Sequence, residues 1–167
     1  MKKRIFTFLA SALVLTLAVV SCSEEEATTV TLNKDLTASL TCYVEAQLIE
    51  DTTAVVYENA PAGTKVFIRV NNSEYNAGAS GVTVYETEVG PQGMFMYDIP
   101  VTENGTNVTI QFDDFVYDQL QYDWDSDIND WVTDGTETKK YSAASLNLML
   151  YAGETQYEKV QYFDTSF

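Results

Sequence analysis

Hydrophobic and polar residues alternate along much of the chain, most clearly over residues 36–48. Every second residue there is apolar, and the residues between are mostly polar. The apolar set is Leu36, Ala38, Leu40, Cys42, Val44, Ala46 and Leu48. A period of two over this length predicts a long β-strand with one buried face.

Shorter alternating runs, separated by Gly, Pro and Asn turns, predict further strands. Their ranges are 54–57, 65–70, 81–89, 94–99, 106–112, 141–151 and 157–163. The residues expected to be buried are Val66, Ile68, Val70, Phe95, Tyr97, Ile99, Val108, Ile110, Phe112, Leu146, Leu148 and Leu150. A tight turn at residues 90–93 predicts that 81–89 and 94–99 pair as a hairpin, and residues 71–81 are expected to form a loop. No stretch predicts a helix, so we expect an all-β fold: one antiparallel β-sandwich of seven or eight strands over residues 36–167.

Residues 113–134 differ from the rest of the chain, because they hold eight Asp and no Lys or Arg. We expect an acidic aromatic hairpin that projects from the sandwich, since this many carboxylates cannot be buried without partner charges. Trp124 and Trp131 are expected to face each other as a cross-strand pair. Together with Tyr122 they are the candidate ligand-binding residues, because exposed rings can stack on a sugar; burial as core residues is the alternative.

Part of this stretch has the spacing of a calcium-binding loop, with oxygen-bearing side chains at alternate positions and an acid at the twelfth. The candidate ligands are Asp123, Asp125, Asp127, Asn129 and Asp134. However, Ile128 stands at the sixth position, where the sharp turn needs Gly, and the last ligand is Asp instead of the longer Glu. We therefore expect no calcium site, and the sequence indicates no other cofactor.

The N-terminal residues have the pattern of an export signal. Three basic residues at positions 2–4 precede an apolar run that ends near Val20, and small and acidic residues follow. This pattern predicts a cleaved signal peptide, because the apolar run is too short for a comfortable membrane-spanning helix.

The last residues of this signal, Val19-Val20-Ser21-Cys22, resemble the lipobox of bacterial lipoproteins. The resemblance implies cleavage after Ser21 and lipid attachment to Cys22, with acyl chains that hold the protein in the outer membrane. The acidic residues 24–26 resemble the Bacteroidota-type signal for the outer face of that membrane; a solvated tether is the alternative interpretation. The expected organisation is a signal peptide over residues 1–21, an acidic and Thr-rich tether over 22–35, and the sandwich.

Composition narrows the function classes. Removal of residues 1–21 takes away three basic residues and no acidic one, so the net charge changes from −16 to −19. This charge excludes nucleic acid as a plausible partner. The chain has no His, which excludes Ser-His-Asp and Cys-His catalysis and His-ligated zinc. With Cys22 modified, Cys42 has no disulfide partner, and its place in the alternation predicts a small buried hydrophobe.

Two segments resemble the transthyretin-like (prealbumin-like) sandwiches, which include the carboxypeptidase-regulatory-like domains. Residues 61–68 resemble the family's Pro-x-Gly step into its second strand, and residues 85–95 its strand, Gly turn and aromatic strand. The resemblance implies a binding, stalk or scaffold module. The hydrolase branch of the family relies on His residues, which this chain lacks.

These observations together predict a lipid-anchored, non-enzymatic binding or scaffold module at the cell surface. The alternative is a carbohydrate-binding lipoprotein, which should show a planar row of exposed rings, whereas a scaffold module should bury them. A glycan hydrolase with two catalytic carboxylates is the third hypothesis. It requires two close acids in a pocket, and 25 acidic residues offer no basis for choosing a pair.

Overall fold

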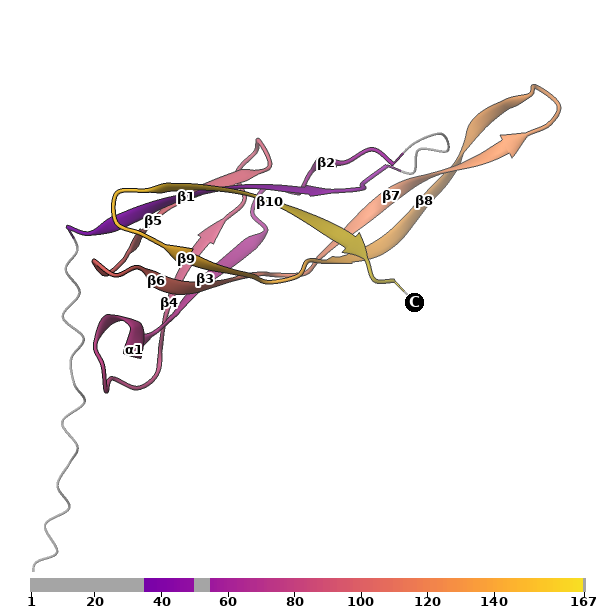
Figure 1. Cartoon of the computed structure of the whole chain (residues 1–167). Coiled ribbons are helices and arrows are strands. Elements are labelled where there is room, and N and C mark those ends of the chain that lie inside the picture. The colour runs from indigo at the N-terminus through magenta and orange to yellow at the C-terminus, as the bar shows by residue number, and fades with distance from the viewer. Residues whose placement is uncertain (1–34, 50–54, 167) are drawn as a thin grey trace, which may run out of the picture.

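The computed structural model describes residues 35–49 and 55–166, which form an all-β structure of two sheets (Figure 1). The strands are β1 (Thr37–Ala46), β2 (Glu58–Asn59), β3 (Lys65–Asn71), β4 (Val82–Glu88), β5 (Met94–Pro100), β6 (Thr106–Phe112), β7 (Phe115–Asp125), β8 (Asp130–Ser142), β9 (Leu146–Leu150) and β10 (Thr155–Asp164). The first sheet has the order β2-β1-β10-β8-β7, and β5 also pairs with β1. The second sheet has the order β4-β3-β6-β9. The described residues thus hold more strands than the seven or eight predicted.

The two sheets pack against each other through the inward faces of their strands. The residues of β1, β3 and β6 in this core are those that the alternation predicts: Ala38, Leu40, Cys42, Val44, Ala46, Val66, Ile68, Val70, Val108, Ile110 and Phe112. Across the interface, the ring centroid of Phe112 lies 6.3 Å from those of both Phe95 and Tyr162 in the other sheet. This packing is that of a β-sandwich.

β1 and β10, the first and last strands among the described residues, lie side by side and parallel, from the pair Ser39 and Thr155 to the pair Ala46 and Tyr162. The prediction of a purely antiparallel sandwich was therefore wrong. Two parallel strands cannot be joined by a tight turn. Here the chain from residue 47 to residue 154, which includes the other strands, connects β1 to β10.

The predicted hairpin of residues 81–89 with 94–99 was also wrong, because β4 pairs with β3 and β5 pairs with β1. The turn at residues 90–93 instead carries the chain from one sheet to the other. Gly93 has a φ of 66°, and a Cβ there would lie 2.6 Å from the side chain of Asn59. Alternation predicts which face of a strand points inward, but it does not predict which strand lies beside it. Because β4 and β5 lie in different sheets, Tyr85 and Tyr97 meet between the sheets, with ring centroids 5.8 Å apart.

Two predicted segments have different boundaries in the structure. The single strand predicted over 141–151 is two strands, since β8 ends at Ser142 and β9 begins at Leu146 in the other sheet. Of its expected buried residues, Leu150 is buried and Leu146 and Leu148 are half-buried. The loop expected over 71–81 includes a one-turn helix, α1 (Asn72–Tyr75).

Candidate functional site

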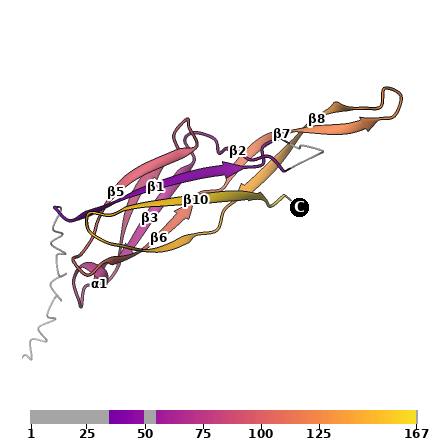
Figure 2. The ribbon, with the colours of Figure 1, turned by 45° about the horizontal axis from the view of Figure 1, so that its top comes forward.

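β7 and β8 form a long hairpin, residues 115–142, whose far end extends away from both sheets (Figures 1 and 2). We call it the arm. Its strands pair from Phe115 with Tyr141 to Asp125 with Asp130, and the register shifts between Leu120 and Tyr122. Such an irregularity increases strand twist and re-aims the strands beyond it. The hairpin predicted near 113–134 is thus present, but it is longer than predicted.

The tip of the arm is a tight turn over residues 126–129. The Asp125 carboxylate accepts a hydrogen bond from the backbone N–H of Asp127 at 2.8 Å, as in an Asx-turn. Asn129 adopts a φ of 56°, in the left-handed region that Asn tolerates better than most residues. Between them, Ile128 is 61% exposed, so the turn presents an apolar side chain to solvent.

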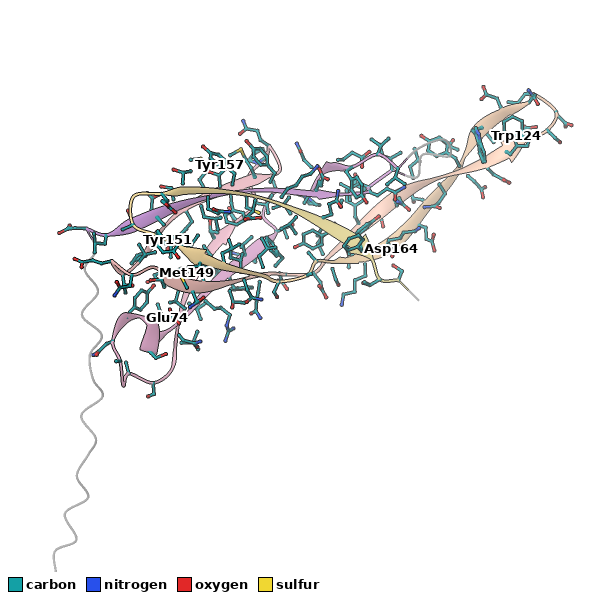
Figure 3. All side chains as sticks on the ribbon, in the orientation of Figure 1. Glu74, Trp124, Met149, Tyr151, Tyr157 and Asp164 are labelled. Atoms are coloured by element: carbon teal, nitrogen blue, oxygen red, sulfur yellow. The ribbon has the colours of Figure 1, made fainter. Side chains whose placement is uncertain are left out.

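Directly behind the tip, Trp124 and Trp131 lie opposite each other on the two strands, as predicted. Their ring centroids are 5.4 Å apart and their planes meet at 71°, an edge-to-face contact. The two side chains are 44% and 41% exposed. Figure 3 shows Trp124 near the far end of the arm, well separated from Asp164 at its base. Tyr122 lies two residues before Trp124, on the same face, and is half-buried.

The carboxylates of the arm face water or cap the backbone. Of the eight Asp residues between positions 113 and 134, seven are exposed and Asp125 is half-buried. Asp123 and Asp130 each accept a hydrogen bond at 2.8 Å from the backbone N–H of the following Trp. Near the base, the Lys140 ammonium lies 2.7 Å from a carboxylate oxygen of Asp114. Hydrogen bonds from Lys140 and Ser142 lower the pKa of Asp114.

The calcium-loop candidates are spread over the tip and both strands. Within the part of the chain that the structure describes, no three acidic or Cys side chains gather as a metal-binding group. Asp123 and Asp125 direct an oxygen to the backbone, as described above, and Asp134 is exposed next to the register shift.

The base of the arm is fixed to the sandwich by polar and aromatic contacts. The side-chain amide of Gln119 and the hydroxyl of Tyr141 both donate to the carbonyl of Gln47, at 2.9 and 2.8 Å. The Phe115 ring stacks on Tyr141 with 5.1 Å between centroids, and it also contacts Tyr162 at 4.8 Å. The role of Gln119 is not predictable from the sequence, because a single buried amide in a polar strand leaves no pattern.

A cavity of about 180 Å³ lies at this base. It is lined by Gln47, Tyr57, Gln119, Lys139, Tyr141, Tyr162, Phe163 and Asp164. Among the described lining residues, the carboxylate of Asp164 lies 3.3 Å from Lys139 Nζ. Partial burial raises the pKa of Asp164, but hydrogen bonds from Ser166 and Lys139 outweigh this effect and lower it. Burial raises the pKa of Tyr141 to about 12. Asp164 and Lys139 thus form an ion pair, and the described lining residues include no second acid beside Asp164.

The predicted lipid-attachment residue Cys22 and the acidic residues 24–26 lie outside the described residues. Among the residues that the structure does describe, no helix is long and apolar enough to cross a membrane.

Comparison with known proteins adds no relative: no protein-family model matches the chain, and no curated protein matches its sequence.

Proposed function

We propose that this protein is a lipid-anchored binding module on the outer face of the outer membrane and that it holds a protein partner at the tip of the arm. The observation that carries the proposal is the exposed pair of Trp124 and Trp131 on a hairpin that extends beyond the sandwich. Large aromatic side chains held away from the core are typical of interaction sites. The anchor is proposed from the resemblance of the residues before Cys22 to a lipobox.

The ring geometry favours a protein partner over a sugar. A sugar platform needs coplanar rings, whereas Trp124 and Trp131 meet at 71°. The exposed Ile128 lies in the turn that follows Trp124, and most Asp side chains of this part of the arm are exposed. Such a surface suits a segment that carries both apolar and Lys or Arg side chains, because cations are attracted to the faces of Trp rings and to the Asp side chains around them.

The finer type of the sandwich is part of the proposal. The resemblance of residues 61–68 and 85–95 to transthyretin-like domains supports it, and the packing of two sheets is compatible with it. Domains of that type serve as binding or scaffold modules, which fits a non-enzymatic role.

Site-specific photo-crosslinking in the producing cell tests the role of the tip. A photoreactive residue replaces Ile128 at the tip or, as a control of similar exposure, Val116 near the base; these side chains are 61% and 64% exposed. We expect a discrete protein adduct from position 128 alone, reduced at least about tenfold when Trp124→Ala and Trp131→Ala are combined. Equal adducts from both positions, or an adduct unaffected by the two substitutions, would contradict the proposal.

Carbohydrate binding is the second candidate, favoured by the exposure of the same two rings. Tryptophan fluorescence measured during titration with bacterial and host polysaccharides distinguishes the two candidates. A saturable change that is lost in Trp124→Ala would establish glycan binding instead of protein binding at the tip.

A further inference from the structure

One long side of the sandwich has two unpaired strand edges. From Thr155 to Tyr162, β10 pairs with β1, and no other strand within residues 35–49 and 55–166 pairs with it over that range. In the second sheet, β9 pairs with β6 alone among those strands. β9 and β10 follow each other through a short turn and run along the same side of the molecule (Figure 1).

The backbone of β10 presents hydrogen-bonding groups at this edge. The carbonyl of Glu154 accepts a hydrogen bond from the N–H of Ser39 at 2.9 Å. In a parallel ladder, the residues that bond to one neighbour alternate with the residues that face the other way. The N–H and C=O groups that face away from β1 are therefore those of Thr155, Tyr157, Lys159 and Gln161. An unpaired row of this kind is a template for an added strand.

The first part of the edge carries polar side chains on its inner face. Gln156 and Glu158 point inward, because their register partners in β1 are the buried Leu40 and Cys42. Both polar side chains are half-buried, and Gln156 Nε2 donates to Glu158 Oε1 at 2.7 Å. No ion pair in the described part of the chain includes Glu158. The edge thus holds a half-buried carboxylate without a cationic partner among these residues.

The neighbouring Lys159 does not fill this role. It points to the outer face of the sheet, where its Nζ lies 2.8 Å from the carboxylate of Glu45. The charge of Glu158 instead acts on the core, since it contributes to the raised pKa of the Cys42 thiol. A cation brought in from outside would therefore meet Glu158 on the inner side of the edge.

Two residues further along β10, the inner face of the edge is apolar. Val160 is buried there and lines a groove of about 390 Å³ together with Ala144, Leu146, Lys159, Gln161 and Phe163. Leu146 faces inward from β9 but remains half-buried, and Phe163 is 57% exposed. An apolar side chain placed opposite Val160 would cover these groups and remove their surface from water.

We propose that the free edge of β10 binds an extended segment of a partner protein in which an apolar residue is followed, two positions later, by Lys or Arg. Side chains on one face of a strand are two residues apart. A segment antiparallel to β10 that places its apolar residue opposite Val160 therefore places the basic residue opposite Glu158. β8 already pairs antiparallel with β10 just beyond this edge. The new ion pair forms in a partly dehydrated site, where opposite charges attract more strongly than in water.

Charge favours this occupant over a second copy of the chain. A second copy brings its own Glu158 and the same negative net charge. Inward-pointing charges are one way in which proteins prevent edge-to-edge pairing, and an entirely apolar strand would leave Glu158 covered without a partner. The tip of the arm contributes no residue to this edge, so the proposal does not rest on the role proposed for the tip.

Hydrogen–deuterium exchange with residue resolution, on the full chain purified in detergent, tests the proposal with the synthetic peptide Thr-Thr-Val-Thr-Lys-Thr-Thr. Without peptide, the N–H groups of Tyr157, Lys159 and Gln161 should exchange rapidly. Excess peptide should slow their exchange at least about tenfold, whereas a peptide with Glu in place of Lys should not. The amides of Gln156 and Glu158, which bond to β1, should be protected throughout and show that the sandwich is folded.

Variants of the chain test the charge. Glu158→Gln should weaken binding of the Lys peptide at least about tenfold, because the ammonium loses its charged partner. The matched control Glu154→Gln removes the same charge from an exposed position in the turn before β10, and should leave the affinity unchanged. The combined substitutions Trp124→Ala and Trp131→Ala should also leave it unchanged.

Four results would overturn the proposal. The first is equal binding of the two peptides, and the second is an equal loss of affinity in Glu158→Gln and Glu154→Gln. The third is loss of binding in the tryptophan variant, which would place the peptide at the tip of the arm. The fourth is protection of Tyr157, Lys159 and Gln161 before peptide is added, because the edge would then already be covered; protection that disappears on dilution would identify the cover as a second copy.

Discussion

At the scale of single residues, Cys42 shows how burial controls chemistry. Its side chain is fully buried in the middle of β1. Burial, together with the nearby Glu158 carboxylate, raises the pKa of the Cys42 thiol to about 12. The thiol therefore stays protonated at neutral pH and is a packing group instead of a nucleophile.

We predict that a thiol reagent modifies Cys42 slowly in the native protein and rapidly in denaturant, measured by mass spectrometry on the Cys22→Ser variant. Native labelling should be limited by unfolding, because the reagent cannot reach the side chain between the sheets. Equal rates in the two conditions would contradict the position of Cys42 in the core.

Glu45, on the outer face of β1, gives a prediction on pH dependence. Its carboxylate lies 2.8 Å from Lys159 Nζ and accepts a hydrogen bond from Gln161 at 2.7 Å. Partial burial raises the pKa of Glu45, but these two partners outweigh it and lower the pKa. Because the pKa is lower in the folded state, Glu45 stabilises the fold above the unfolded-state pKa of about 4.3. This contribution is lost as the pH falls through the folded-state pKa.

Glu45→Gln should accordingly lower the free energy of unfolding by about 0.5–1 kcal/mol near neutral pH, and the difference should vanish at about pH 2. Urea denaturation at the two pH values measures it. Glu103→Gln, at an exposed turn position, serves as the control and should have little effect at either pH. A deficit of the same size at both pH values would show that the loss is one of packing.

At the scale of elements, the arm is joined to the sandwich by few backbone bonds. β8 pairs with β10 at Ser142 with Phe163 and at Tyr141 with Asp164. In addition, Thr165 N–H donates to the carbonyl of Lys140 at 2.7 Å, and Ile49 forms an isolated bridge with Leu120. Side chains add to these backbone contacts, and two of them, Gln119 and Tyr141, donate to the same carbonyl.

This shared acceptor predicts non-additive mutations. Gln119→Leu and Tyr141→Phe should each cost about 1 kcal/mol or less, because the Gln47 carbonyl keeps one donor. The double variant should cost about 1 kcal/mol more than the sum, because that carbonyl loses both. Urea denaturation of the four proteins measures the coupling. Tyr162→Phe, which removes a bond to a different acceptor, the carbonyl of Asp113, should combine additively with Gln119→Leu.

The elements also show what alternation can and cannot predict. It identified β1, β3 and β6 and their buried faces, since one side of each strand packs on the core. It could not assign β4 and β5 to different sheets, because an inward face does not specify a neighbour. The arm is longer than predicted because residues 133–138, in the middle of β8, are exposed on both faces, so the sequence there has no period. The facing tryptophans were predictable from the sequence. The role of Gln119 was not, because its hydrogen bond is to Gln47, 72 positions earlier in the chain.

At the scale of the whole molecule, the proposed function depends on the anchor. We predict that the mature protein begins at a lipid-modified Cys22, detected by mass spectrometry, and that Cys22→Ser releases the protein from the membrane fraction. Two or more acyl chains bind stably to a bilayer. Loss of the attachment site should therefore move the protein from the membrane fraction to the soluble fraction. An unmodified amino terminus, or a variant that stays in the membrane, would contradict the anchor.

The parallel pairing of β1 with β10 has a mechanical consequence. The arm lies at the opposite end of the sandwich from the start of β1 (Figure 2). A pull between an anchored N-terminus and a partner at the arm therefore acts along the strands, and β1 is loaded in shear. It is held over eight residue pairs by β10 and seven by β5. Interstrand hydrogen bonds lie across this direction, so many must break together instead of one after another. The parallel pairing of β1 with β10 should therefore make the domain resistant to unfolding by a force applied between the anchor and the arm.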